Sequence, residues 1–105
     1  MEKRDFEGRQ IEVDEEGFIQ DYGQWDQKVA AILARDDGIE ELSPEHWRVV
    51  NYIRDYYEEF QMAPMVRKLC KKTDFSLKEI MKLFPSGPAK GACKVAGLPK
   101  PKGCV

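Results

Sequence analysis

The sequence predicts a mainly helical (α+β) protein: a small helical bundle with an N-terminal β-hairpin and a flexible C-terminal arm. Three observations support this fold class. Apolar residues recur at helical spacing over most of residues 24–84, and they alternate with polar residues at strand spacing near the N-terminus. Proline and glycine concentrate after residue 85, where they interrupt any regular pattern. With 105 residues, the chain has the size of one domain with a modest core.

Residues 1–19 are expected to form the hairpin. Glu7-Gly8 has the composition of a tight turn, and Ile11 and Val13 alternate with polar residues in the strand that follows it. A first helix is expected over residues 24–34, because apolar residues lie there at helical spacing on one face. That face consists of Trp25, Val29, Ile32 and Leu33.

The second helix has a clear start, because Ser43 is a preferred N-cap residue and Pro44 suits the first helical position. Its sustained apolar stripe predicts a central buried helix: Trp47, Val50, Ile53, Tyr57 and Phe60. A third helix is expected over residues 64–72. The sequence Ser76-Leu77-Lys78-Glu79 matches a capping box and opens a fourth helix, which Pro85 ends. Its inward-facing residues are expected to be Leu77, Ile80, Met81 and Phe84.

The net charge of −2 hides an uneven distribution along the chain. Residues 1–63 carry 7 basic and 17 acidic side chains, whereas residues 64–105 carry 10 basic and 2 acidic ones. No apolar run approaches the roughly 18 residues of a membrane-spanning helix, and the first residues lack the apolar core of a secretory signal. The three cysteines make an odd number, which argues against a purely structural disulfide framework. We therefore expect a cytoplasmic protein whose thiols are free or redox-active.

The globular body is expected to span residues 1–85, and residues 86–105 are expected to form the flexible arm. This arm carries Cys93 and the penultimate residue Cys104, and its prolines have no amide hydrogen for a helix or sheet. Fully extended, the last twelve residues would reach roughly 40 Å from the body. This reach suits a thiol that enters the active site of another protein, and we interpret Cys104 in this way.

The two arm cysteines are expected to act as a pair. Ten residues separate Cys93 from Cys104, and a disulfide across a loop of this length would constrain the open chain by roughly 3 kcal/mol. The arm is therefore expected to alternate between an extended dithiol and a closed disulfide. Its basic side chains should favour the nucleophilic thiolate form of both cysteines: Lys94, Lys100 and Lys102.

Three runs in the C-terminal part of the chain form a specific pattern: LFPSGPAKGAC at 83–93, AGLPKP at 96–101 and GCV at 103–105. This pattern closely resembles the DsrC/TusE family of sulfur-carrier proteins. The similarity continues upstream, for example in LSPEHW at 42–47 and APMVR at 63–67, and covers nearly the whole chain. Because TusE-like members typically keep only the penultimate cysteine, the presence of both arm cysteines resembles the DsrC type.

The resemblance implies a sulfur-transfer protein and co-substrate without turnover of its own. Cys104 would accept sulfur inside dissimilatory sulfite reductase, and Cys93 would then close a trisulfide or disulfide with it. The partners implied are the alpha and beta subunits of that reductase, a membrane-bound heterodisulfide-reductase-like complex and other sulfurtransferases. The siroheme and iron–sulfur cluster would belong to the reductase, and no cofactor or metal is expected in this chain. Arg67 aligns with a helix arginine that is expected to approach Cys104 when the arm folds back.

The direction of sulfur flow and two other functions stay open. Residues 71–81 lack the insertion that the resemblance leads us to expect in many TusE-like members, which favours the sulfite-reducing type. A TusE-like persulfide carrier in tRNA thiolation is one alternative. A helix-turn-helix DNA-binding regulator is the other, because residues 64–84 contain two short helices rich in basic residues. We expect Cys70 to be a small buried core residue, and His46 to be exposed or to cap the second helix.

Overall fold

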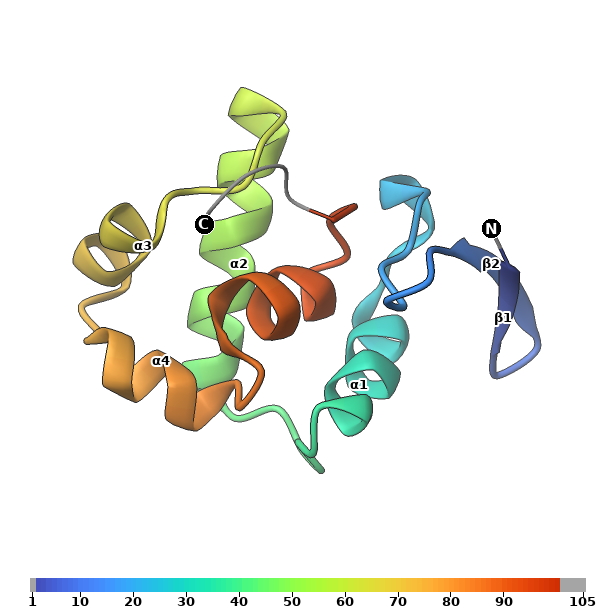
Figure 1. The fold of residues 1–105 in the computed structure, drawn as a ribbon, viewed down its shortest axis with the longest axis horizontal. Helices are drawn as coiled ribbons and strands as arrows, with labels where there is room; N and C mark the ends of the chain where they lie inside the picture. Colours follow the sequence, from blue (N-terminus) through green and yellow to red (C-terminus); the bar gives the residue numbers. More distant parts are fainter. Residues whose placement is uncertain (1, 101–105) are drawn as a thin grey trace.

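The computed structural model describes residues 2–100, so the predicted site residues Lys102 and Cys104 lie outside the described part of the chain. It shows the predicted mainly helical α+β architecture with a two-stranded antiparallel hairpin (Figure 1). The elements follow in the order β1 (Glu2–Phe6), β2 (Arg9–Val13), the 3₁₀ helix η1 (Tyr22–Gln24), α1 (Gln27–Asp36), α2 (Pro44–Phe60), α3 (Val66–Thr73), α4 (Leu77–Leu83) and the π-helix η2 (Pro88–Cys93). Among residues 2–100, no helix combines the length and apolar character needed to cross a membrane.

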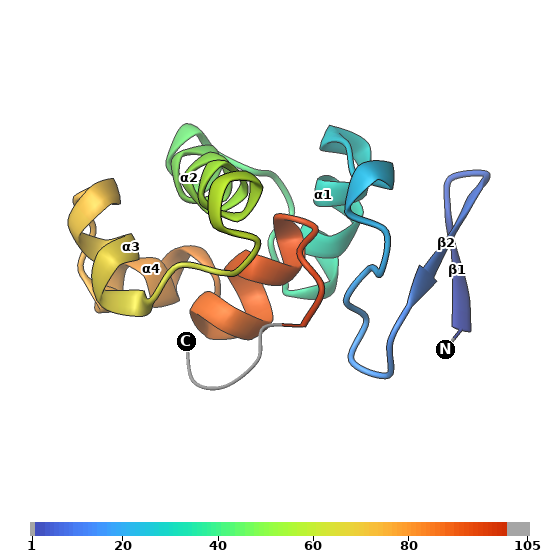
Figure 2. The same ribbon diagram turned by 90° about the horizontal axis from the view of Figure 1, so that it is seen from above.

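The hairpin forms where the sequence predicts it. Glu7 and Gly8 have φ angles of 55° and 99°, and positive φ at both central residues is typical of the type I′ turn that matches the twist of paired strands. Ile11 and Val13 are buried on the face of β2 that contacts the core. Figure 2 shows the hairpin at one end of the molecule, beside the segment that leads to α1, with α3 and α4 at the opposite end.

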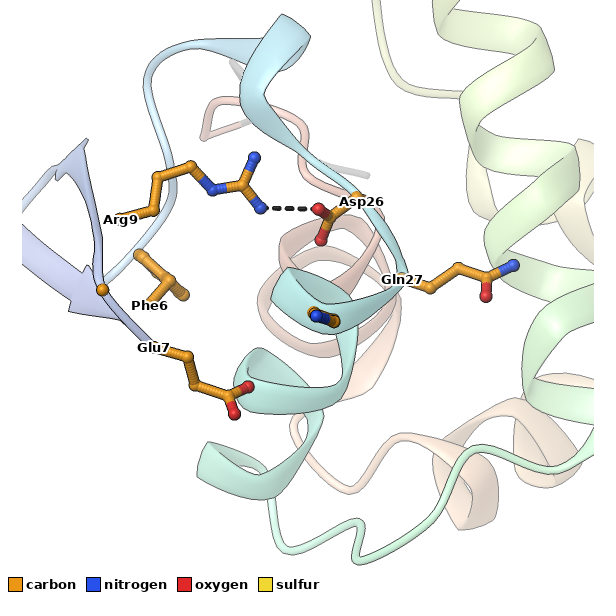
Figure 3. A pocket seen from close by; sticks show the side chains of 7 residues that line it. Phe6, Glu7, Arg9, Asp26 and Gln27 are labelled. Atoms are coloured by element: carbon orange, nitrogen blue, oxygen red, sulfur yellow. Dashed lines mark hydrogen bonds and ion pairs between the residues drawn. The ribbon is translucent and has the colours of Figure 1, made fainter.

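Asp26 connects the hairpin to α1, which begins slightly later than predicted. Its Oδ1 accepts the backbone N–H of Val29 at 2.9 Å as the N-cap of the helix, and its Oδ2 accepts a bond from Arg9 Nη2 at 2.5 Å. Figure 3 shows this ion pair bordering an open hollow of about 790 Å³ between the hairpin turn and the start of α1. The Val29 N–H and then Arg9 lower the pKa of Asp26, because both favour the carboxylate.

We expect Asp26→Ala to lower the free energy of unfolding by about 1 kcal/mol near neutral pH, because it removes an N-cap. Since the pKa of Asp26 is lowered in the folded protein, this stabilisation should be present above the unfolded pKa and disappear as the pH falls through the folded one. Urea unfolding at several pH values measures both effects. Asp36→Ala is the matched control. It also removes an ion pair between the hairpin and α1, the one with Arg4, but it does not remove an N-cap. Equal losses for the two variants would contradict the capping role.

The start of α2 is capped as predicted, and His46 has a capping role. The Ser43 backbone N–H donates to His46 Nδ1 at 3.0 Å, and Ser43 Oγ accepts the His46 backbone N–H at 3.3 Å. His46 Nε2 lies 2.8 Å from the Leu83 carbonyl oxygen, so this side chain also joins α2 to the end of α4. Phe60 is 49% exposed and not buried as expected, because the last turn of α2 projects beyond the other helices (Figure 1).

α3 and α4 form the predicted pair of short helices. Asp74 ends α3 in a left-handed conformation, and Ser76 and Glu79 form the predicted capping box of α4. Ile80 and Phe84 are buried as expected, but Leu77 and Met81 are 45% and 48% exposed. The latter two lie four residues apart on a different face of the helix, and α4 is not covered there.

The segment after α4 differs most from the prediction. Residues 88–95 form η2 and a further helical turn, and Figures 1 and 2 show this helix in the middle of the molecule, between α1 and α2. Its apolar side chains belong to the central core: Ala92, Cys93, Val95, Ala96 and Leu98. The predicted body boundary at residue 85 is therefore wrong, because the fold continues to Leu98.

Candidate functional site

Cys93 lies in the last turn of η2 and is only 1% exposed. It belongs to the same core cluster as Val50 and Ile53 of α2, against which η2 packs. The helix forms here because Pro88 suits a helix start and small residues allow close packing. At Gly91, a Cβ atom would lie 2.9 Å from Asp37 Oδ2 and 3.0 Å from Phe84 Cβ. The tight packing of this helix places the Cys93 thiol inside the protein.

Burial raises the pKa of Cys93 from its ordinary value of 9.0 to about 12. The cause is desolvation by burial, because the core disfavours the charged thiolate. The expectation that neighbouring lysines favour a thiolate at Cys93 is therefore wrong for the folded protein. Near neutral pH, Cys93 is a protonated thiol that is neither exposed nor nucleophilic.

This pKa shift predicts a loss of stability at alkaline pH. Below pH 9 the thiol is protonated in both states, whereas between pH 9 and about 12 only the unfolded thiol ionises. The contribution of Cys93 to the free energy of unfolding should therefore fall by about 1.4 kcal/mol per pH unit above pH 9. Urea unfolding of the reduced protein and of Cys93→Ala between pH 8 and pH 10.5 measures this as a shrinking difference. Parallel stability curves for the two proteins would exclude the raised pKa.

The helix that contains Cys93 ends in a Schellman motif. The Leu98 N–H donates to the Cys93 carbonyl at 3.2 Å, and the Gly97 N–H donates to the Lys94 carbonyl at 3.0 Å. Gly97 has a φ of +81°, which is the left-handed conformation that this motif needs at its C′ position. The two apolar residues Cys93 and Leu98 are both buried at this helix end.

Two side chains bind the next two carbonyl groups of this helix end. Trp25 Nε1 donates to the Val95 carbonyl at 2.8 Å, and Nη1 of Arg54, on α2, donates to the Ala96 carbonyl at 2.8 Å. With the Schellman bonds, all four terminal carbonyls of the helix have a hydrogen-bond partner within the protein. Arg54 also places a positive charge at the negative end of the helix dipole. We call these two side chains, Trp25 and Arg54, the helix-end clamp.

The helix-end clamp is itself held in place by aromatic packing. The Arg54 guanidinium lies 3.8 Å from the centre of the Trp25 ring and 4.0 Å from that of Tyr22. The Tyr22 hydroxyl donates to the Arg54 carbonyl at 3.3 Å, and the Tyr22 ring packs on Tyr57. Desolvation by this packing lowers the pKa of Arg54, which still stays a cation at neutral pH. No sequence pattern reveals the clamp, since its side chains lie 70 and 42 residues from the carbonyls they bind.

Two of the predicted arm lysines contact the loop that follows β2. Lys100 Nζ lies 2.5 Å from Glu16 Oε2, and the hydrogen bond to Glu16 raises the pKa of Lys100. Lys94 Nζ lies over the Phe18 ring at 5.3 Å. Both cations are thus engaged by the body of the protein. Their predicted support of a Cys104 thiolate concerns a residue outside the described part of the chain, and it stays a prediction.

Arg67 is exposed on α3, where it lines a basic surface groove of about 720 Å³. The groove also contains Tyr56, Met65, Lys68, Lys71 and Lys72. The predicted approach of Arg67 to Cys104 stays a prediction, because Cys104 lies outside residues 2–100. Cys70, on the same helix, is partly buried against the core, in agreement with a packing role.

Comparison with known proteins decides the family. Residues 5–105 match the family model described as DsrC like protein. The chain belongs to the DsrC family. It is 48% identical over 100 residues to "Sulfite reductase, dissimilatory-type subunit gamma" of Nitratidesulfovibrio vulgaris, which covers 95% of each chain. It is also 45% identical over 107 residues to "Sulfurtransferase TusE" of Shigella dysenteriae, which covers 95% of this chain and 97% of the relative.

The solved structures of the DsrC family agree with this assignment. A chain in the crystal structure of dissimilatory sulfite reductase I (DsrI) has a TM-score of 0.92 and 48% identity, with 98% of this chain and 99% of that chain covered. The names of these relatives refer to sulfite reduction and sulfur transfer. They give no support to the alternative of a DNA-binding regulator, which was based on the α3–α4 pair.

Proposed function

We propose that this DsrC-family protein is a sulfur carrier and a co-substrate of a dissimilatory sulfite reductase in the cytoplasm. Cys104 accepts the sulfur atom, and Cys93 is the thiol that closes the bridge. The observation that carries the proposal is the 48% identity to a reductase gamma subunit over 95% of both chains. The partners are the reductase alpha and beta subunits, whose siroheme and iron–sulfur cluster perform the reduction. This chain then has no turnover of its own.

The presence of two thiols sets the electron balance of the reaction. A trisulfide forms when Cys104 and Cys93 each lose a proton and both bond to the same incoming sulfur atom. This sulfur atom arrives at the +2 oxidation level and carries two hydroxyl groups. That sulfur takes two electrons from the two thiols, and its two hydroxyl groups leave as water. Reduction of the trisulfide then needs four electrons and four protons, and it returns two thiols and one hydrogen sulfide. A membrane-bound heterodisulfide-reductase-like complex is the proposed source of these electrons.

The burial of Cys93 supports a fixed order for these steps. Thiolates react as nucleophiles, and the pKa of Cys93 is about 12 in the folded protein. A sulfur donor in solution or in a partner therefore does not react first with Cys93. Loading starts at Cys104, and Cys93 acts only when it becomes accessible.

A TusE-like persulfide carrier is the second candidate, and the 45% identity to a TusE protein favours it. Over the same 95% share of this chain, the alignment to TusE is longer than that to the gamma subunit, 107 against 100 positions. The TusE relative therefore contains residues that this chain lacks, as the short interval at residues 71–81 suggested. We favour the reductase co-substrate for this reason and because both arm cysteines are present.

The test is to incubate the reduced protein with a purified dissimilatory sulfite reductase, sulfite and an electron donor, and to map its peptides by mass spectrometry. The proposal expects one additional sulfur atom that links the peptides of Cys93 and Cys104. A TusE-like carrier would instead take sulfur from a cysteine desulfurase and keep it on Cys104 alone. If the reductase leaves no sulfur on either cysteine, the co-substrate role is wrong.

A further inference from the structure

We propose that the helix-end clamp, Trp25 and Arg54, positions the arm and controls when Cys93 meets the sulfur on Cys104. This inference rests on the proposed roles of the two cysteines. The clamp residues bind backbone carbonyl groups and are proposed to act through them, so they are positioning residues. Their action is exerted through the helix end that they bind.

The clamp fixes the point where the arm leaves the body. It binds the Val95 and Ala96 carbonyls at 2.8 Å each, and Leu98 directly afterwards is the last buried residue of the described chain. Six residues then lead to Cys104, which reach roughly 20 Å when fully extended. The clamp thus halves the reach expected for an arm that begins at Lys94, and it gives the arm a constant origin. A constant origin favours delivery of Cys104 to one site in a partner.

The same contacts keep Cys93 out of reach. A bridge to Cys104 requires another sulfur atom to contact the Cys93 thiol directly, but Cys93 is 1% exposed. The Cys93 carbonyl accepts a hydrogen bond from the Leu98 N–H. Two and three residues later, the Val95 and Ala96 carbonyls accept hydrogen bonds from Trp25 and Arg54. The helix end must therefore open before the bridge closes. Opening breaks the two clamp bonds, since they join this end to Trp25, directly after η1, and to Arg54 of α2.

The clamp is suited to local opening. The Arg54 guanidinium has five N–H donors, but it makes a single hydrogen bond from its side chain, and no ion pair, within residues 2–100. Its other contacts are the faces of Trp25 and Tyr22. Tyr22 lies in η1, Trp25 directly follows η1 and Arg54 lies in α2, and these elements need not unfold when the helix end leaves them. Segments held by a few hydrogen bonds open far more often than a whole domain unfolds.

The experiment measures the accessibility of Cys93 without any sulfur chemistry. In a full-length Cys70→Ser/Cys104→Ser protein, Cys93 is the single thiol, and its alkylation by iodoacetamide at pH 8 reports how often it opens. Adding Arg54→Met or Trp25→Phe should raise the alkylation rate roughly tenfold, as expected for the loss of one net hydrogen bond. Arg48→Met is the matched control. Like Arg54, Arg48 lies on α2, donates a hydrogen bond to a backbone carbonyl and lies over an aromatic ring. Its partners are the Thr73 carbonyl, at 3.4 Å, and the Phe75 ring, which do not belong to the helix end after Cys93.

Denaturant separates a positioning role from a merely structural one. If the opening is local, alkylation of Cys93 in the clamp variants stays nearly independent of low urea concentrations. If the alkylation rate instead rises with urea in parallel with global unfolding, the proposal is wrong. It is also wrong if Arg48→Met, for an equal loss in the free energy of unfolding, raises the alkylation rate of Cys93 as much as the clamp variants do. Arg54→Lys keeps a cationic donor and should restore part of the slow rate.

A second readout uses both arm thiols. In the Cys70→Ser protein, oxidised glutathione forms a mixed disulfide at Cys104 and releases one glutathione thiol. Cys93 then attacks the Cys104 sulfur, which closes the internal disulfide and releases the second glutathione. Clamp variants should accelerate this second step roughly tenfold and leave the first unchanged. Unchanged closure in both clamp variants would overturn the inference. Neither readout needs a sulfite reductase, so failure of the proposed function and failure of the clamp are distinguishable.

Discussion

Cys104→Ala should carry no sulfur after incubation with a dissimilatory sulfite reductase and sulfite, whereas Cys93→Ala should carry sulfur on Cys104 without closing the bridge. The reason is the difference in access between the two thiols. Cys93 is buried and has a pKa of about 12, so it cannot replace Cys104 as the acceptor. Intact-protein and peptide mass spectrometry of both variants measures the amount of sulfur and its position.

Cys70→Ser is the matched control for this pair of variants. Cys70 is the third thiol of the chain and is partly buried on α3, so its loss should leave loading and bridge closure unchanged. Sulfur bound to Cys93 in the Cys104→Ala variant would reverse the two roles. A normal trisulfide in the Cys93→Ala variant would exclude Cys93 as the second thiol.

The parts of the fold that local sequence determines were predicted. The hairpin turn needs positive φ at Glu7 and Gly8, and Ser43 and Ser76 mark helix starts through bonds to residues three positions away. Such interactions leave a signal within four residues, which a sequence pattern reveals. The mistakes for Leu77 and Met81 concern the degree of exposure, which depends on whether another element covers that face.

The packing of residues 88–98 into the core was missed because the prolines and glycines after residue 85 were interpreted as signs of a flexible arm, in which only a short helical turn around residues 90–95 was considered. Pro88 stands at the helix start, where its missing N–H has no cost. Gly91 faces Asp37 and Phe84 too closely for any larger residue, and Gly97 occupies the C′ position of the Schellman motif. The spacing of Ala92, Val95 and Ala96 is a helical signal that was available in the sequence.

The clamp had no comparable signal in the sequence. Trp25 and Arg54 bind carbonyl groups, and a backbone carbonyl has no residue type that a pattern can identify. Trp25 was predicted as a core residue of a helix, although it follows η1 and precedes α1. Its role depends on the tertiary position of the helix that contains Cys93. The structure was therefore needed to connect Cys93 with Trp25 and Arg54, which lie far from it in the sequence.

Gly97→Ala should lower the free energy of unfolding by about 3 kcal/mol or more. Two costs combine at this position: a left-handed φ of +81° for a residue with a Cβ, and overpacking of a filled site. A Cβ atom at Gly97 would lie 2.3 Å from Trp25 Cδ1 and 2.6 Å from Trp25 Cγ. Because the indole ring is held by its bond to Val95 and by Arg54, it cannot move away without breaking the clamp.

Gly38→Ala isolates the contribution of the Trp25 contact. Gly38 also has a φ of +81° and follows α1 in the same Schellman motif, but a Cβ atom there has no neighbour within 4 Å. Its substitution should cost only the conformational term, about 1 kcal/mol, in urea unfolding of the same protein. Equal losses in the free energy of unfolding at the two glycines would show that the Trp25 ring moves aside at little cost. A larger loss at Gly97, together with faster alkylation of Cys93, would instead show that the same contacts stabilise the helix end and keep Cys93 buried.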